Sequence, residues 1–176
     1  RIMEIIRQAQ AQMRALGSLQ WQDGYPARAD IDRDIARGYG YVFEKSDAAE
    51  NPAAAETPQK YDKGTVPGGV IAYGAAVFDG EPAYGAIDGA WLTGGDYVVL
   101  HRLAVADGEK GRGVAAEFMR RTEALARGRG VGSFRVDTNF DNRYMLRMLE
   151  RLRFAYCGKI IYESGERLAF EKPLEA

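Results

Sequence analysis

The segment VLHRLAVADGEKGRGVAAEFMRRTEAL, residues 99–125, places two glycines where an apolar run gives way to an amphipathic one. This pattern predicts a β-strand before Gly111 and Gly113 and a helix after them. The first turn of a helix presents unpaired N–H groups and partial positive charge, and glycines let an anion approach the main chain closely. The two glycines are therefore candidates for a phosphate-binding cradle built from main-chain amides. The alternative is that they only turn the chain.

The spacing excludes two well-known nucleotide-binding loops. A P-loop needs a Lys-Ser/Thr pair after its last glycine, whereas Val114 and Ala115 follow Gly113 here. The dinucleotide fingerprint G-x-G-x-x-G needs a third glycine, and that position is Ala116. A nucleotide-phosphate binder without transferase activity stays open as a further alternative.

Positive charge is concentrated around this loop. The whole chain has 24 Lys and Arg against 25 Asp and Glu, for a net charge of -1. Residues 101–153 hold 12 of the basic residues and 7 of the acidic ones, so the rest of the chain is acidic. A basic excess confined to one segment favours a small anionic ligand over a nucleic-acid surface, which needs a broader excess. Solvated helix faces explain many of these arginines equally well.

Hydrophobic periodicity predicts the elements that must position the loop. Helices are expected at 2–16, around Ile31 and Ile35, at 113–128 and at 145–152. Strands are expected at 40–44, 70–78, 97–105 and 133–140, followed by a C-terminal hairpin that turns at ESGE. Residues 46–69, with three of the six prolines, are expected to form a long loop, and the glycine-rich residues 79–96 are expected to be irregular. The order predicts one α/β (mixed α+β) domain over residues 1–176, with a central mixed, twisted sheet and helices on both faces.

The glycine loop and a later segment resemble the acyl-CoA-binding region of the GCN5-related N-acetyltransferase (GNAT) family. The family pattern Gln/Arg-x-x-Gly-x-Gly/Ala is similar to KGRGVA at residues 110–115, with Lys in place of Gln or Arg. The stretch DTNFDNRYMLRMLERLRFAYCG resembles the second segment of the family, and the element order agrees over nearly the whole chain. Residues 21–35 and 81–105 look like those of a bacterial branch.

The resemblance implies acetyl-CoA as co-substrate and names the residues that would bind it. Main-chain groups of residues 103–105 would pair with the pantetheine arm, and the amides of residues 111–115 would hold the pyrophosphate. The implied CoA-binding set is Leu103, Ala104, Val105, Lys110, Gly111, Arg112, Gly113, Val114, Ala115, Asn139 and Asn142. Arg112, Arg143 and Arg147 are alternative partners for the phosphates, and the sequence does not choose among them.

Acyl transfer to an amine needs a proton acceptor for the attacking nitrogen. His101 is the only histidine of the chain. Alternation along the strand predicts that His101 shares a face with Leu103 and Val105. A neutral imidazole there would accept the proton directly or through water. The alternative is a hydrogen-bonded core histidine.

The acid that protonates the leaving sulfur is less clear. The family often uses a tyrosine on its last helix, but the aligned position here is Leu149. Tyr156 and Tyr144 are candidate substitutes, and for each the alternative is a half-buried structural aromatic. Cys157 is expected to be a small buried side chain rather than a nucleophile.

These observations favour an acetyl-CoA-dependent N-acetyltransferase whose acceptor is a primary amine of a small molecule or peptide. The alternative is a non-catalytic acyl-CoA-binding sensor or interaction module, for which the absence of a tyrosine at Leu149 is the main argument. Acidic residues in the first quarter of the chain would attract a cationic amine, although a polar surface also explains them. They are Asp23, Asp30, Asp32, Asp34 and Glu44.

Composition bears on the compartment, the metal content and the partners of the protein. One cysteine allows no disulfide within the chain and fits a reducing, cytoplasmic compartment. One histidine and one cysteine without ligand spacing predict no metal site. No run of 18 apolar residues is present, so we expect no membrane partner. A homodimer is the default expectation for such a domain.

Overall fold

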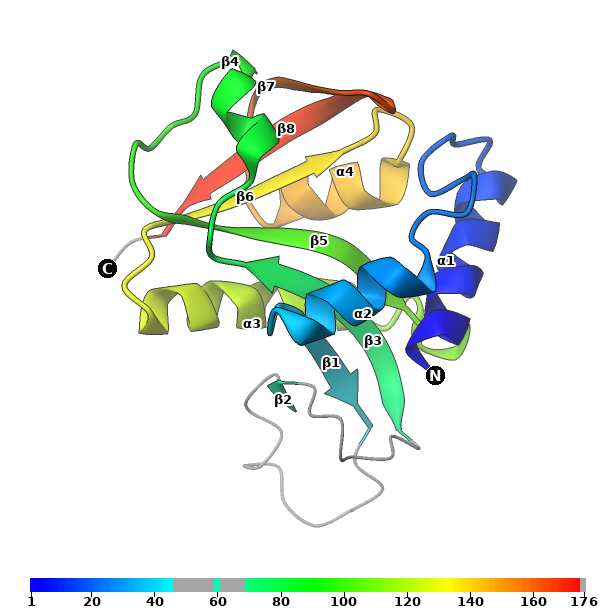
Figure 1. Cartoon of the computed structure of the whole chain (residues 1–176). Helices are drawn as coiled ribbons and strands as arrows, with labels where there is room; N and C mark the ends of the chain where they lie inside the picture. The colour runs from blue at the N-terminus through cyan, green and yellow to red at the C-terminus, as the bar shows by residue number, and fades with distance from the viewer. Residues whose placement is uncertain (46–58, 61–68, 175–176) are drawn as a thin grey trace.

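A mixed sheet forms the centre of the computed structural model, which describes residues 1–45, 59–60 and 69–174 (Figure 1). The strand order across the described residues is β2-β1-β3-β5-β6-β8-β7-β4. Every neighbouring pair is antiparallel except β5 and β6, which are parallel. The strands are β1 (Gly40–Glu44), β2 (Gln59–Lys60), β3 (Val70–Val77), β4 (Asp88–Gly89), β5 (Tyr97–Val105), β6 (Ser133–Thr138), β7 (Ala155–Tyr162) and β8 (Gly165–Pro173).

Helices cover both faces of this sheet, as predicted. On one face, α1 (Ile2–Ala15) and α2 (Arg28–Ala36) form an apolar cluster with inward side chains of β1, β3 and β5. On the other face, α3 (Val114–Gly128) and α4 (Arg143–Arg151) enclose a second cluster. Each helix turns apolar side chains toward the sheet, and their burial together with those of the strands stabilises the fold.

The predicted element boundaries agree closely with the structure. The strands at 40–44 and 97–105 match residue for residue, and the C-terminal hairpin turns between Tyr162 and Gly165. The segment 79–96 is more ordered than predicted, because it contains a 3-10 helix, η1 (Pro82–Ala86), and the short strand β4. The loop predicted at 46–69 lies outside the described residues apart from 59–60 and 69.

The sheet opens between its two parallel strands. β5 and β6 pair only where Tyr97–Val99 meets Ser133–Arg135. Beyond Val99 the strands diverge, as Figure 1 shows. The edge of β5 from Leu100 to Val105 therefore has no strand partner on that side within the described residues. Its main-chain groups are free to pair with an extended ligand.

A β-bulge interrupts β5 at the same place. Gly74 of β3 stands opposite two residues of β5, Arg102 and Leu103, because the register shifts by one there. Arg102 has φ 55°, a left-handed value that is uncommon for a residue other than glycine. Gly74 is required for a separate reason: a Cβ on it would lie 2.8 Å from the ring of Phe118, so α3 packs directly on the β3 backbone.

The bulge corrects one prediction about the site. His101 was expected to share a face with Leu103 and Val105. The structure instead places Leu103 and Val105 against the cluster under α3 and α4, whereas His101 points to the opposite face, toward Glu81. An extra residue in a strand reverses the side of every later side chain, and nothing in the local alternation reveals it.

Candidate active site

The loop before α3 presents main-chain N–H groups that no described part of the chain uses. Gly111 and Gly113 have φ values of 76° and 84°. From Gly111 to Ala116 no amide has an acceptor within the described residues, and the first bond of the helix runs from the Glu117 amide to the Gly113 carbonyl at 2.9 Å. A Cβ on either glycine would meet nothing within 4 Å. Unpaired donors around open space at a helix start fit an anionic group.

A cavity of about 610 Å³ adjoins this loop. It lies between the unpaired edge of β5, the start of α3, α4 and α1, and its volume is that of a typical small-molecule site. Most of the residues that the resemblance assigned to CoA lie on its wall. They are Leu103, Ala104, Val105, Lys110, Gly111, Gly113, Val114, Ala115 and Asn142.

Two residues of that set lie elsewhere. Arg112 is exposed, and its guanidinium lies 3.5 Å from the carboxylate of Glu109. Asn139 is buried at the end of β6 and does not line the cavity. The basic side chains on the cavity wall are Lys110 and Arg151.

Arg151 is a basic residue of the cavity wall that the sequence analysis missed. It stands one helical turn after Arg147, and two turns after Arg143, on α4. Arg112, Arg143 and Arg147, the three alternatives named from the sequence, do not line the cavity. Helical spacing predicts that Arg143, Arg147 and Arg151 share a side of α4, but only the cavity shows which of them reaches it.

Asn142 positions α4 against the rest of the cavity wall. Its side-chain oxygen accepts a hydrogen bond from the Met145 amide at 3.2 Å and so caps the helix. Its side-chain nitrogen donates to Gln20 at 3.2 Å, and the nearby Ser18 hydroxyl donates to Asp141 at 2.7 Å. These bonds join the start of α4 to the loop that follows α1, and both segments border the cavity.

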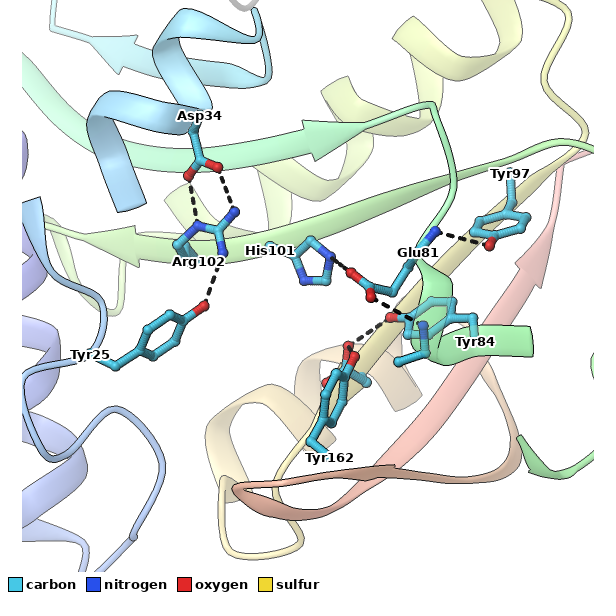
Figure 2. A network of polar contacts seen from close by, with 10 residues as sticks. Tyr25, Asp34, Glu81, Tyr84, Tyr97, His101, Arg102 and Tyr162 are labelled. Atoms are coloured by element: carbon cyan, nitrogen blue, oxygen red, sulfur yellow. Dashed lines mark hydrogen bonds and ion pairs between the residues drawn. The ribbon is translucent and has the colours of Figure 1, made fainter. Parts of the chain in front are cut away.

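A polar network occupies the other face of the sheet, around the opening between β5 and β6 (Figure 2). His101 Nε2 lies 3.1 Å from Oε2 of Glu81. The other oxygen of Glu81 accepts from the Ala83 amide at 3.3 Å, and the Glu81 amide donates to the Tyr97 hydroxyl at 3.1 Å. The hydrogen bond with His101 lowers the pKa of Glu81, which outweighs the opposite effect of burial. Glu81 is therefore a carboxylate at neutral pH.

Asp137 of β6 forms the second part of this network. The Tyr84 hydroxyl donates to Asp137 Oδ1 at 2.7 Å, and the Tyr162 hydroxyl lies 3.4 Å from the same oxygen. Burial raises the pKa of both tyrosines, and the nearby carboxylates of Asp137 and Glu81 raise it further. Both tyrosines therefore keep their protons and serve as neutral hydrogen-bond donors.

Arg102 forms the third part of the network. It donates to both oxygens of Asp34, and a further nitrogen donates to the Tyr25 hydroxyl at 2.9 Å (Figure 2). Asp34 therefore has a partner inside the fold. Asp30 and Asp32 are likewise paired, with arginines of their own helix. Three of the five acidic residues expected to attract a cationic amine thus already have an arginine partner that neutralises their charge.

The candidate acids lie outside this network. Leu149 is fully buried in the core, so the usual tyrosine position is a packing position here. Tyr144 lies on the cavity wall and is more than half exposed. Tyr156 is exposed too, and its ring packs on Phe170 at 5.7 Å between centroids. Burial raises the pKa of the Cys157 thiol, which makes it a poor nucleophile.

The sequence analysis did not identify Glu81, Tyr84, Asp137 or Tyr162 as members of a site. Glu81 directly precedes Pro82, and an acidic residue before proline is a helix-start signal. That signal predicts the turn but not its approach to His101. Among residues 1–45, 59–60 and 69–174, no three His, Cys, Asp or Glu side chains gather as metal ligands would. Nor is any helix in these ranges long and apolar enough to cross a membrane.

The mixed sheet opens between two parallel strands, with a glycine loop and a helix start beside the opening. The chain belongs to the acetyltransferase (GNAT) family, whose model matches residues 14–154. It is 33% identical to a GNAT-family acetyltransferase from Streptococcus agalactiae 2603, over 99% of this chain and 88% of that one, with a TM-score of 0.78.

More distant structures share the fold alone. A GNAT-family acetyltransferase from Listeria monocytogenes 4b F2365 is 18% identical, over 97% of this chain and 86% of that one, with a TM-score of 0.67. A chain of the NatC complex bound to Gag peptide and CoA is 13% identical, over 85% of this chain and 82% of that one, with a TM-score of 0.58. No curated protein matches the chain significantly.

Proposed function

We propose that this protein transfers an acetyl group from acetyl-CoA to a primary amine of a small molecule or peptide. One observation carries the proposal. Unpaired amides at the start of α3 and the unpaired edge of β5 border a single cavity, and His101, with its polar network on the opposite face of the sheet, belongs to the part of β5 that β6 leaves unpaired.

The cavity supports a bound acyl-CoA. The amides of residues 111–115 would bind the pyrophosphate, and Arg151 adds positive charge on the same cavity wall, whereas Lys110 is already paired with Asp107. The main chain of residues 103–105 lies on the wall and offers an edge to the pantetheine arm. When bound, acetyl-CoA supplies the thioester whose carbonyl carbon is attacked.

His101 is the proton acceptor in this proposal. Its ring lies at the opening between the strands and is largely buried, although part of it remains exposed. The acceptor nitrogen loses a proton to His101 as it bonds to the carbonyl carbon. The leaving group is a thiolate, which departs readily because thiols are moderately acidic, with a pKa of about 8.5 for cysteine, and which takes up a proton near neutral pH. Solvent is therefore a sufficient proton donor, and the absence of a tyrosine at Leu149 does not prevent turnover.

A non-catalytic acyl-CoA-binding module is the second candidate. The core position of Leu149 favours it, as does the location of Tyr144 and Tyr156 away from His101. The two candidates share the cavity and differ only in turnover. Release of CoA in the presence of an amine therefore separates them.

The first experiment is a thermal melt with acetyl-CoA, with CoA and ATP as comparisons. A ligand at 100 times its Kd stabilises the fold by about 2.7 kcal/mol, a shift of several degrees in Tm. We expect a shift with acetyl-CoA and CoA and none with ATP, followed by CoA release when a panel of amines is added. No shift with acetyl-CoA would refute both candidates, and a shift without turnover on any amine would favour the binding module. The homodimer and the cytoplasmic location stay predictions.

A further inference from the structure

We infer that Glu81 is a positioning residue that fixes which ring nitrogen of His101 accepts the proton. The catalytic role of His101 in this inference rests on the proposed function. In this arrangement Nε2–H of His101 donates a hydrogen bond to Glu81, and Nδ1 is the base that accepts the proton of the amine.

The contact between the two side chains determines the tautomer. Glu81 Oε2 lies 3.1 Å from His101 Nε2. An ionised carboxylate only accepts hydrogen bonds, so Nε2 must carry the hydrogen. A neutral imidazole has one N–H, and its other nitrogen then holds a lone pair. Nδ1 is consequently the proton acceptor of the neutral ring.

The surroundings hold Glu81 in one orientation. It is the N-cap of η1, and its Oε1 accepts from the Ala83 amide. Its own amide donates to the Tyr97 hydroxyl of β5, two pleats before His101 on the same strand. The side chains of His101 and Glu81 are only 19% and 24% exposed. A fixed, largely buried carboxylate orients an imidazole better than a mobile surface one.

Nδ1 remains available to substrate. Within the described residues, no group forms a hydrogen bond with Nδ1. Nδ1 is also absent from the fully buried polar atoms that lack a partner, so it is not sealed inside the protein. Other charged or titratable groups of the network have partners of their own. Arg102 is paired with Asp34, while Tyr84 and Tyr162 share the carboxylate of Asp137.

The acceptor nitrogen forms a bond to the thioester carbonyl carbon, and the C–S bond breaks with its electron pair leaving on sulfur. One proton moves from the nitrogen to His101 Nδ1, while Nε2–H remains bonded to Glu81. The thiolate takes this proton from the imidazolium, directly or relayed through water. The products are an N-acetyl amine and CoA, and the ring returns to its starting tautomer.

The tautomer can be measured without turnover, because His101 is the only histidine of the chain. Two-dimensional NMR of the ¹⁵N-labelled imidazole at pH 8 distinguishes a protonated ring nitrogen from an unprotonated one with no assignment step. We expect wild-type protein to show N–H at Nε2 and a lone pair at Nδ1. In Glu81→Gln we expect a mixture of tautomers, since an amide side chain either accepts or donates. Wild-type protein with N–H at Nδ1, or the same spectrum in both proteins, would overturn the inference.

Kinetics tests whether Glu81 acts through His101. We expect Glu81→Gln to lower kcat by about 10- to 100-fold, less than the roughly 100- to 10,000-fold that a proton-transfer group itself contributes, and to leave KM for acetyl-CoA within twofold. The double variant with His101→Gln should be no slower than His101→Gln alone, because effects of residues that act as a unit do not multiply. Glu166→Gln, at an exposed ion pair with Lys159, is the matched control and should keep wild-type kcat.

A double variant slowed by the product of the two single effects would show that Glu81 acts independently, and would overturn the positioning role. Wild-type protein that binds acetyl-CoA but acetylates no amine would refute the proposed function. In that case the NMR comparison still decides whether Glu81 fixes the tautomer.

Discussion

Arg102 and Asp34 form a two-point ion pair across 68 residues of chain, with both nitrogen–oxygen distances at 2.6 Å. Asp34 belongs to α2, and Arg102 is the bulge residue of β5, next to His101. The same carboxylate accepts from the Tyr73 hydroxyl at 2.8 Å. Burial, together with Asp34, raises the pKa of Tyr73, so this hydroxyl remains a donor. The pair thus joins a helix to the strand position where the alternation of side chains reverses.

Loss of this pair should destabilise the fold. In Asp34→Asn, a largely buried guanidinium loses its charge partner, which typically costs about 3–5 kcal/mol. Urea denaturation at pH 7 measures the change in the free energy of unfolding. Asp32→Asn is the control, because Asp32 pairs with Arg28 on the exposed side of α2 and such pairs contribute about 0–1 kcal/mol. Equal, small effects of the two variants would show that Arg102 gains nothing from Asp34.

Gly113→Ala should weaken acetyl-CoA binding with a limited loss of stability. Gly113 has φ 84° at the N-cap of α3, a conformation that costs an alanine about 1–2 kcal/mol. The added methyl group also points into the open space beside the unpaired amides. We expect the Kd for acetyl-CoA, measured by calorimetry, to rise at least tenfold.

Gly128→Ala tests the opposite end of the same helix. A Cβ there meets nothing within 4 Å, and Gly128 is not among the glycines with positive φ. Alanine at this position should be neutral or stabilise the helix by up to about 1 kcal/mol, with the Kd for acetyl-CoA unchanged. If Gly113→Ala also left the Kd unchanged, the loop would only turn the chain.

The sequence predicts these features to different degrees, depending on how local their causes are. The strand–glycine–helix transition around Gly113 depends on neighbours in sequence, so periodicity and turn chemistry predict it. The bulge at Arg102 cannot be predicted in this way, because one extra residue leaves the apolar pattern of YVVLHRLAV intact. The contact of Glu81 with His101 depends on the path of the segment between them, which was expected to be irregular. Tertiary packing, not local propensity, determines that path.

Arg151→Gln should weaken acetyl-CoA binding through charge. Arg151 lies on the cavity wall and has no ion pair within the described residues. An exposed charge pair near 4 Å is worth about 1 kcal/mol in water, so we expect a Kd about fivefold higher at low salt. The difference from wild type should shrink at 0.5 M NaCl, where the Debye length is well under 10 Å.

Arg147→Gln is the matched control on the same helix. Arg147 does not line the cavity, so its variant should bind acetyl-CoA as wild-type protein does at every salt concentration. A loss of affinity in Arg147→Gln but not in Arg151→Gln would reverse the assignment of the phosphate partner.

Glu171 ties β8 to the segment that follows β4. Its side chain is fully buried and accepts hydrogen bonds from the Thr93 hydroxyl at 2.6 Å, from Arg135 at 3.0 Å, and from the Ser133 hydroxyl and the Leu92 amide. Burial by itself raises the pKa of Glu171, but these hydrogen bonds outweigh it and hold the pKa below its usual value.

This lowered pKa predicts how stability depends on pH. The unfolded chain has a glutamate pKa of about 4.3, and the folded value is lower. The ionised group therefore contributes its full stabilisation above about pH 4.3, and this contribution is lost as the pH falls through the folded value.

The Glu171→Gln variant has no ionisable side chain at this position, so its stability lacks this dependence on pH. Urea denaturation between pH 3 and 7.5 measures the difference in free energy of unfolding between wild type and Glu171→Gln. We expect this difference to be constant above about pH 5.5 and to shrink below about pH 4. Glu150→Gln, on the exposed side of α4, should follow wild type throughout. A gap for Glu171→Gln that stays constant down to pH 3 would contradict the proposed ionisation.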